Sequence, residues 1–327
     1  MRRRDILVWM VNAVAWSFTV RGAWSAASPA KIGWLKIQGP HHSPDQLKAF
    51  REGMTTLGQS EGRDYVLVER YGDDNEARLS GLAAELVGLD VRLILATSQP
   101  SIAAAARVTK TVPIIGRLND DPVENGMAKS LARPGGNISG IYSLAEELTP
   151  KRLSLLKEVV PSAQHVGVLL RKDWPNAKRA WQDAESAAKQ LGLEVVALDA
   201  RSAGELAAAL DDAGAKHLDG IITFRNPTVV TNLKLIAEQC QKLRLPAVFD
   251  AREYVDAGGL MSYGPNIDAI YRQLARFAVK LLNGASAGEM PIEEPTKFEL
   301  VINRHTADAI GVQLPPDLSA SADRVIE

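Results

Sequence analysis

The chain has 327 residues, 46% of them hydrophobic, and its 38 Lys and Arg nearly balance its 39 Asp and Glu. This length and apolar content suit one large or two medium domains, each with its own core. A formal net charge of -1 and few aromatic residues (6%) argue against a nucleic-acid-binding surface.

The N-terminus has the pattern of an export signal. Three arginines (residues 2–4) precede the apolar run 6–20, and a segment of small residues follows it. Fifteen residues are too few for a membrane span, which needs about 20, so residues 1–27 are predicted to be a cleaved signal peptide rather than an anchor. No cysteine lies near the cleavage zone, so we expect an exported, periplasmic protein without a lipid anchor. Both general (Sec) and twin-arginine export stay open.

From Lys31 onward, short apolar strands alternate with amphipathic helices. This alternation predicts a doubly wound parallel sheet. The predicted strands of this first series are 31–35, 64–70, 91–97, 112–118 and 137–143, and the predicted helices are 45–58, 76–88, 100–110 and a stretch around 123–135.

A second alternating series follows and predicts a second Rossmann-like lobe of similar size. Its predicted helices are 151–161, 176–192, 203–214 and 229–243, and its predicted strands are 165–170, 193–199, 218–224 and 246–250. After residues 251–264 we expect a long helix at 267–284, a proline-rich link at 290–303 and a terminal helix at 304–311. The two series show no clear repeat in sequence.

The single cysteine, Cys240, lies in step with Ile236 and Leu243 on the apolar side of the helix predicted at 229–243. This position predicts a small buried side chain. The alternative, a reactive thiol, would need a cationic neighbour that the local sequence does not supply.

Signals for catalysis and for metal binding are weak. The chain has no nucleophile elbow, no P-loop and no His-Glu-x-x-His motif. His41 and His42 lack a third metal ligand at a suitable spacing, and the stretch 119–122 lacks the twelve-residue calcium pattern. We therefore expect no catalytic residues, no metal and no cofactor.

Candidate ligand-binding residues lie at the strand ends, because open parallel sheets bind ligands beyond the carboxyl ends of their strands. In "TSQPS", Ser98 or Gln99 would begin a helix with Pro100 as its first residue, an arrangement that can hold a carboxylate, although ordinary capping explains the same residues. Trp174 could form a lid over the ligand or pack on its own loop. The full set of candidates is Ser43, Thr97, Ser98, Gln99, Asn119, Asp121, Tyr142, Ser143, Asp173, Trp174, Arg225, Asn226, Thr228, Asp250 and Tyr263.

The turn from Pro134 to Asn137 combines a fixed φ with two glycines, which indicates a sharp connection into the strand at 137–143. We expect it to be structural, without a role in ligand binding. Tyr142 and Ser143, at the end of that strand, are better ligand candidates.

Several blocks of the sequence resemble the ABC-transporter substrate-binding proteins of the tryptophan/tyrosine-binding type, a branch of the type I periplasmic binding proteins. The most specific are "DPVENGMAKSLARPGGNISGI" and "GGLMSYGPN", and others are "GRDYVLVERYG", "LAAELVGLDVRLILAT", "KRLSLLKEVVP" and "PTKFELVINRHTADAIGVQLPPDLSASADRVIE". The resemblance extends to the last residue. The loops "LKIQGPHHSP" and "LLRKDWPN" vary within such families and leave the ligand open.

The resemblance implies two lobes joined by three crossings, near residues 140–143, 250–254 and 291–295. The N-terminal lobe would comprise residues 31–141 and 254–291, and the C-terminal lobe residues 142–253 and 292–327. It also implies a monomeric receptor that closes around an amino acid or another small carboxylate and delivers it to an ABC permease in the inner membrane. An exported enzyme or a ligand sensor on the same scaffold are alternatives. A repressor of related fold is disfavoured, since an export signal stands where a helix-turn-helix would be.

Overall fold

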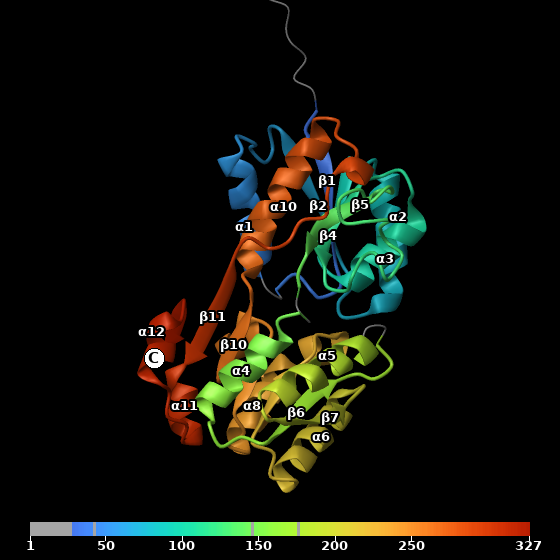
Figure 1. Cartoon of the computed structure of the whole chain (residues 1–327). Helices are drawn as coiled ribbons and strands as arrows, with labels where there is room; N and C mark the ends of the chain where they lie inside the picture. The colour runs from blue at the N-terminus through green and yellow to red at the C-terminus, as the bar shows by residue number, and fades with distance from the viewer. Residues whose placement is uncertain (1–27, 42–43, 145–146, 175–176) are drawn as a thin grey trace, which may run out of the picture.

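A computed structural model describes residues 28–41, 44–144, 147–174 and 177–327. The chain forms two α/β lobes, one above the other in Figure 1. The predicted signal peptide lies outside the described residues. Within the described ranges, none of the helices combines the length and the apolar character that a membrane crossing needs.

The first lobe is built on a five-stranded parallel sheet in the order β2-β1-β3-β4-β5. Successive residues of a strand face opposite sides, so Trp34 of β1 packs towards α1 and α10, whereas Leu35 packs towards α2 and α3. The strands are β1 (Ala30–Lys36), β2 (Tyr65–Tyr71), β3 (Leu93–Ala96), β4 (Ile114–Leu118) and β5 (Ile138–Tyr142), and the helices are α1 (Pro44–Thr56), α2 (Leu79–Gly88), α3 (Gln99–Val108) and α10 (Ile267–Leu282), with a 3-10 turn at Glu76–Arg78.

The second lobe has a seven-stranded sheet in the order β12-β11-β10-β9-β8-β6-β7. Its part β7-β6-β8-β9-β10 repeats the strand order of the first sheet, a repeat that is not visible in the sequence. Among the strands that the structure describes, β10 and β11 are the one antiparallel pair. The strands are β6 (His165–Leu170), β7 (Glu194–Asp199), β8 (Gly220–Thr223), β9 (Ala247–Phe249), β10 (Met261–Pro265), β11 (Phe298–Asn303) and β12 (Arg324–Ile326).

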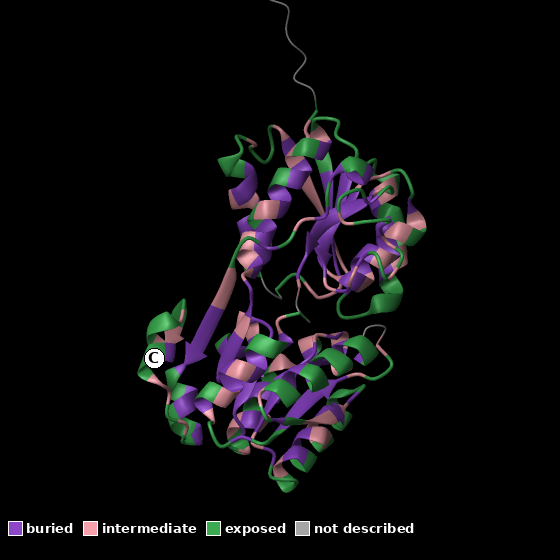
Figure 2. Ribbon diagram, viewed as in Figure 1, coloured by how far each residue is buried: buried purple, intermediate pink, exposed green. Residues whose placement is uncertain are grey.

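Helices cover both faces of the second sheet. The cluster with α4 and α5 lies on one face, and the cluster with α6 and α8 lies on the other. Figure 2 shows the strands buried and the outer sides of the helices exposed. The prediction of two doubly wound lobes is confirmed. The helices are α4 (Thr149–Val159), α5 (Ala177–Gln190), α6 (Ala203–Ala215), α7 (Pro227–Thr231), α8 (Leu233–Lys242), α9 (Arg252–Asp256), α11 (Arg304–Ile310) and α12 (Pro316–Ser321).

The helix predicted around 123–135 is wrong, because this segment is a series of turns. The side chain of Asp121 accepts the backbone N–H groups of Val123 and Glu124, and Gly126 adopts a φ of 73°. Such local side-chain bonds replace the helical ladder. The helix predicted at 229–243 is divided into α7 and α8, and the predicted proline-rich link contains β11.

The second crossing between the lobes lies later in the chain than the expected residues 250–254. Residues 250–265 remain in the second lobe, since β10 pairs with β9 on one side and with β11 on the other. The chain crosses between Pro265 and Ile267, where α10 begins against the first sheet. The boundary at residue 254 is therefore corrected to about residue 266.

The other two connections between the sheets follow β5 and precede β11. The first follows Tyr142, the last residue of β5. The third follows Glu293, because the carbonyl of Glu293 still accepts the N–H of Tyr142 at 2.8 Å, whereas β11 starts at Phe298 in the second sheet.

The turn at Pro134–Asn137 packs against the returning chain after α10. Gly135 adopts a φ of 73°, which favours glycine, and its N–H donates to the carbonyl of Gly288 at 2.9 Å. The side-chain amide of Asn137 donates to the carbonyls of Thr109 and Val112. These bonds give the turn a structural role.

Cys240 is buried in α8, as predicted from its place on the apolar side. Burial raises the pKa of the thiol to about 12, so the thiol stays protonated and unreactive at neutral pH.

Candidate functional site

A cavity of about 160 Å³ lies between the lobes, where the carboxyl ends of the strands of both sheets meet. Seven of the predicted ligand-binding residues line it: Thr97, Ser98, Gln99, Asn119, Trp174, Arg225 and Asn226. The other lining residues are Ile37, Gln38, Gln46, Asp74, Glu76, Pro100, Arg117 and Asp120 from the first lobe and Pro227, Val230, Thr231, Leu233, Glu253 and Tyr254 from the second.

The N-terminus of α3 forms part of the cavity wall in the first lobe. Ser98 is its N-cap, with an extended backbone, and its hydroxyl accepts the N–H of Ser101 at 3.4 Å. The helix begins at Gln99, one residue earlier than predicted, so Pro100 occupies the second position. The free N–H groups of a helix start carry partial positive charge, which favours an anion.

Arg225 and Asp250 form a buried ion pair at the ends of β8 and β9, with 2.7 Å between guanidinium nitrogen and carboxylate oxygen. Burial alone would raise the pKa of Asp250, but Arg225 and Arg152 hold it below its ordinary value. Asp250 therefore serves as the counter-ion of Arg225. Its contact with ligand remains a prediction, since it lies behind the residues that line the cavity.

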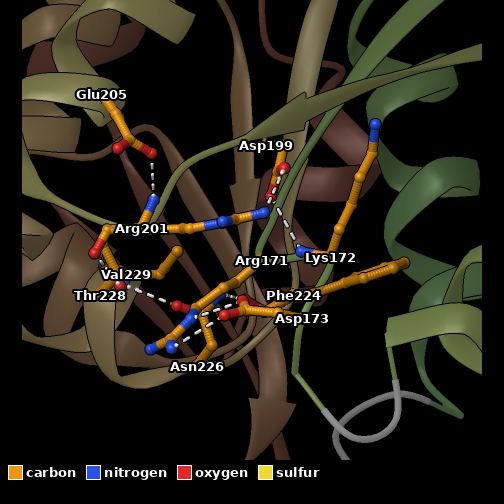
Figure 3. A network of polar contacts seen from close by, with 10 residues as sticks. All are labelled: Arg171, Lys172, Asp173, Asp199, Arg201, Glu205, Phe224, Asn226, Thr228 and Val229. Atoms are coloured by element: carbon orange, nitrogen blue, oxygen red, sulfur yellow. Dashed lines mark hydrogen bonds and ion pairs between the residues drawn. The ribbon is translucent and has the colours of Figure 1, made fainter.

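Asn226 uses its side chain within its own loop. It is the N-cap of α7, accepting the N–H of Val229 and donating to the carbonyl of Phe224. The hydroxyl of Thr228 donates to the carbonyl of Arg201, so Thr228 ties α7 to the neighbouring loop (Figure 3). The same view shows Asp173 paired with Arg171, and both side chains are partly exposed.

Trp174 lies at the cavity and also contacts its own loop, and its role as a lid over the ligand stays a prediction. It lines the cavity, and the guanidinium of Arg171 lies 5.7 Å from the centre of its ring. The ring is therefore a wall of the cavity that also packs on its own loop.

Tyr142 and Asp121 lie outside the main cavity, at a smaller hollow between the lobes. The hydroxyl of Tyr142 donates to Glu147, and Asp121 lies 3.7 Å from Arg179 of α5. Arg179 also pairs with Glu124, so these residues link the lobes rather than face the main cavity.

The remaining candidates are placed as follows. The hydroxyl of Ser143 donates to Asn119 at 3.4 Å, which fixes a residue of the cavity wall. Tyr263 packs against the core of the second lobe. Ser43 and His42 lie outside the described residues.

Two cations that the sequence did not single out lie near the carboxyl ends of their strands: Arg117 lines the cavity, and Lys36 directly precedes the lining residue Ile37. Burial lowers the pKa of Lys36 to about 8, and the negative charge of Glu253 only partly opposes this shift. Burial, together with the positive charge of Arg225, lowers the pKa of Arg117 to about 10. Both residues were missed because their only sequence signal is a cation next to apolar residues: Lys36 is the last residue of β1, and Arg117 lies inside β4.

Five polar atoms in the wall are buried and have no hydrogen-bond partner among the described residues: Thr97 Oγ1, Gln99 Oε1, Arg117 Nε, Glu253 Oε2 and Tyr254 Oη. Buried polar groups are nearly always paired in native proteins, so a concentration of unpaired ones in a cavity marks a place for a polar ligand. Both lobes contribute to the set. Within the described ranges, no three His, Cys, Asp or Glu residues are grouped as metal ligands.

Comparison with known proteins gives consistent results. The family described as "ABC transporter substrate binding protein" matches residues 41–326. A tyrosine-binding protein from Clostridioides difficile is 27% identical over 274 residues, which cover 84% of this chain and 79% of that protein. A Streptococcus pneumoniae ABC domain solved in complex with L-Trp superposes with a TM-score of 0.82 at 22% identity, covering 91% of this chain and all of that chain. An arabinose-binding protein from Geobacillus stearothermophilus shares the fold, with a TM-score of 0.61 at 13% identity over 86% of this chain and 99% of that chain.

Proposed function

Since the chain belongs to the family of ABC transporter substrate-binding proteins, we propose that it captures an aromatic amino acid between its lobes and delivers it to a membrane permease. The family consists of binding proteins and not of enzymes. The lobes would close around the ligand by rotation at the three crossings, with no bond made or broken.

The set of unpaired buried atoms in the cavity wall carries this proposal. An amino acid offers a carboxylate, an ammonium group and a side chain, each of which has a counterpart in the wall. Arg117 and the start of α3 suit the carboxylate, and Glu253 suits the ammonium group. Trp174 and Leu233 supply apolar surface for a side chain.

The aromatic class of the ligand is supported by the relatives. The curated relative is named for tyrosine, and the pneumococcal structure contains L-Trp. Other amino acids and other small carboxylic acids carry the same carboxylate group, and they are alternative ligands within the same proposal.

The signal-like residues 1–27 support export to the periplasm, where such a receptor would meet a permease of the inner membrane. We propose that the protein works as a monomer, because a two-lobe receptor completes its own binding site.

A thermal-shift screen tests the proposal. The chain without residues 1–27 is unfolded, dialysed to remove carried-over ligand, refolded and melted with each proteinogenic amino acid and with aromatic acids. L-tyrosine or L-tryptophan should raise the melting temperature by several degrees, because ligand binds only the folded state. A flat response to the whole panel would contradict the proposal.

A further inference from the structure

Arg117 occupies an unusual position for a cation. It lies within β4, a strand in which every residue is buried, and only 5% of its surface is exposed. That small exposed part faces the cavity between the lobes. Because β4 lies between β3 and β5, an apolar residue would ordinarily occupy the position of Arg117.

Two other arginines with little exposed surface, Arg152 and Arg225, have partners, whereas Arg117 contacts none among the described residues. Arg225 pairs with Asp250, and Arg152 donates to the carbonyl of Tyr263 at 2.9 Å. Across the described part of the chain, Arg117 makes no hydrogen bond and has no carboxylate within ion-pair distance, and its Nε is unpaired. Burial and the positive charge of Arg225 lower the pKa of Arg117, and the negative charges of Glu253 and Asp250, which do not contact it, oppose this shift only in part. A buried cation without a counter-ion is strongly unfavourable, and an anionic ligand would relieve it.

The surroundings of Arg117 supply further donors for an anion. Gly116 is level with Ala96 in the parallel sheet, so Arg117 and Thr97 are level on neighbouring strands. The hydroxyl of Thr97 is buried and unpaired, and α3 starts two residues later. A guanidinium, a hydroxyl and a helix N-terminus thus converge from adjacent strand ends of one lobe.

We propose that Arg117 anchors the carboxylate of the ligand, together with Thr97 and the start of α3, and so restricts the site to carboxylic acids. The planar guanidinium can hold both carboxylate oxygens, which a lysine cannot do. Amines and amides of the same shape lack the charge that Arg117 needs. This inference rests on the cavity as the binding site, as proposed above, but not on the aromatic nature of the ligand.

The test compares L-tyrosine with tyramine, which lacks the carboxylate, by calorimetry on the refolded chain without residues 1–27. Wild type should bind L-tyrosine at least about thirtyfold more tightly than tyramine, and Arg117→Met should remove most of that difference. The preference of Arg117→Lys for L-tyrosine over tyramine should lie between that of wild type and that of Arg117→Met. Arg201→Met, at the edge of the second lobe outside the cavity, is the control and should keep the preference (Figure 3).

A second readout needs no ligand at all. Without ligand, Arg117→Met should melt at or above the temperature of wild type, because an uncompensated buried charge has been removed. Melting well below wild type would make Arg117 a structural residue and contradict the inference. The inference is also contradicted if Arg117→Met keeps its affinity for L-tyrosine and still prefers L-tyrosine to tyramine.

If wild type binds neither aromatic amino acid, the aromatic assignment fails but the anchor can still be tested. Acetate, benzoate and succinate are then used in thermal shift. If a carboxylate raises the melting temperature of wild type but not that of Arg117→Met, the result supports Arg117 as the anchor. If no carboxylate raises the melting temperature of wild type, or if both proteins are stabilised equally, the inference is overturned.

Discussion

The guanidinium of Arg225 lies 2.7 Å from the carboxylate of Asp250, a residue 25 positions later in the chain. Both side chains are buried, with 9% and 2% of their surfaces exposed. The pair joins the ends of β8 and β9, so the charge of Arg225 is balanced within the second lobe. Arg117, on the first-lobe side, has no such contacting partner within the described ranges, which leaves its positive charge in the cavity wall for the carboxylate of a ligand to balance.

Asp250→Asn should destabilise the protein by about 3–5 kcal/mol, because it leaves Arg225 buried without a counter-ion. Urea unfolding measures the change. Asp173→Asn is a matched control, since Asp173 pairs with Arg171 at the exposed edge of the same lobe, and it should hardly alter stability. Similar small effects of both substitutions would show that the buried pair does not stabilise the fold.

Ser98→Asp should weaken binding of L-tyrosine by at least about tenfold, because it places a negative charge beside the anion position. The melting temperature without ligand should change little, since aspartate also caps helices well. Ser202→Asp makes the same change at the N-cap of α6, away from the cavity, and should leave affinity intact. Unchanged affinity of Ser98→Asp in calorimetry would mean that the anion is held elsewhere.

The stability of wild type relative to Lys36→Met should rise with pH between about 8 and 10.5. The pKa of Lys36 is lowered to about 8 in the folded protein from an ordinary value of 10.5. Between these values the unfolded chain binds more protons than the folded one, so the free energy of unfolding increases with pH. Urea unfolding of both proteins across this range isolates the contribution of Lys36. A difference that stays constant with pH would show that the pKa is not lowered.

Trp174 should report ligand binding through its fluorescence. Without residues 1–27 the tryptophans are Trp34, Trp174 and Trp181, and Trp34 is 1% exposed in the core of the first lobe. L-tyrosine, with excitation selective for tryptophan, should change the emission of wild type, and Trp174→Phe should lose most of the change. A full change with unaltered affinity in Trp174→Phe would place this side chain outside the binding site.

The arrangement of strands and helices could be predicted from the sequence because the periodicity of apolar residues is a local property. The place of β10 could not, since its pairing with β9 and β11 depends on segments far apart in the chain. Ser98 and Trp174, which line the cavity, could be predicted as candidates because strand ends follow from topology. Arg117 and Lys36 were missed, because a cation within an apolar strand gains its meaning only from the partners it has or lacks in three dimensions.

The central claim is that the cavity takes up one carboxylate ligand and returns it unchanged. Native mass spectrometry of the refolded chain without residues 1–27, mixed with L-tyrosine or L-tryptophan, tests it most directly. We expect one ligand per chain, recovered on denaturation with its mass unaltered, and a much weaker adduct with Arg117→Met. Conversion of the ligand to another mass, or the absence of any adduct with wild type, would contradict it.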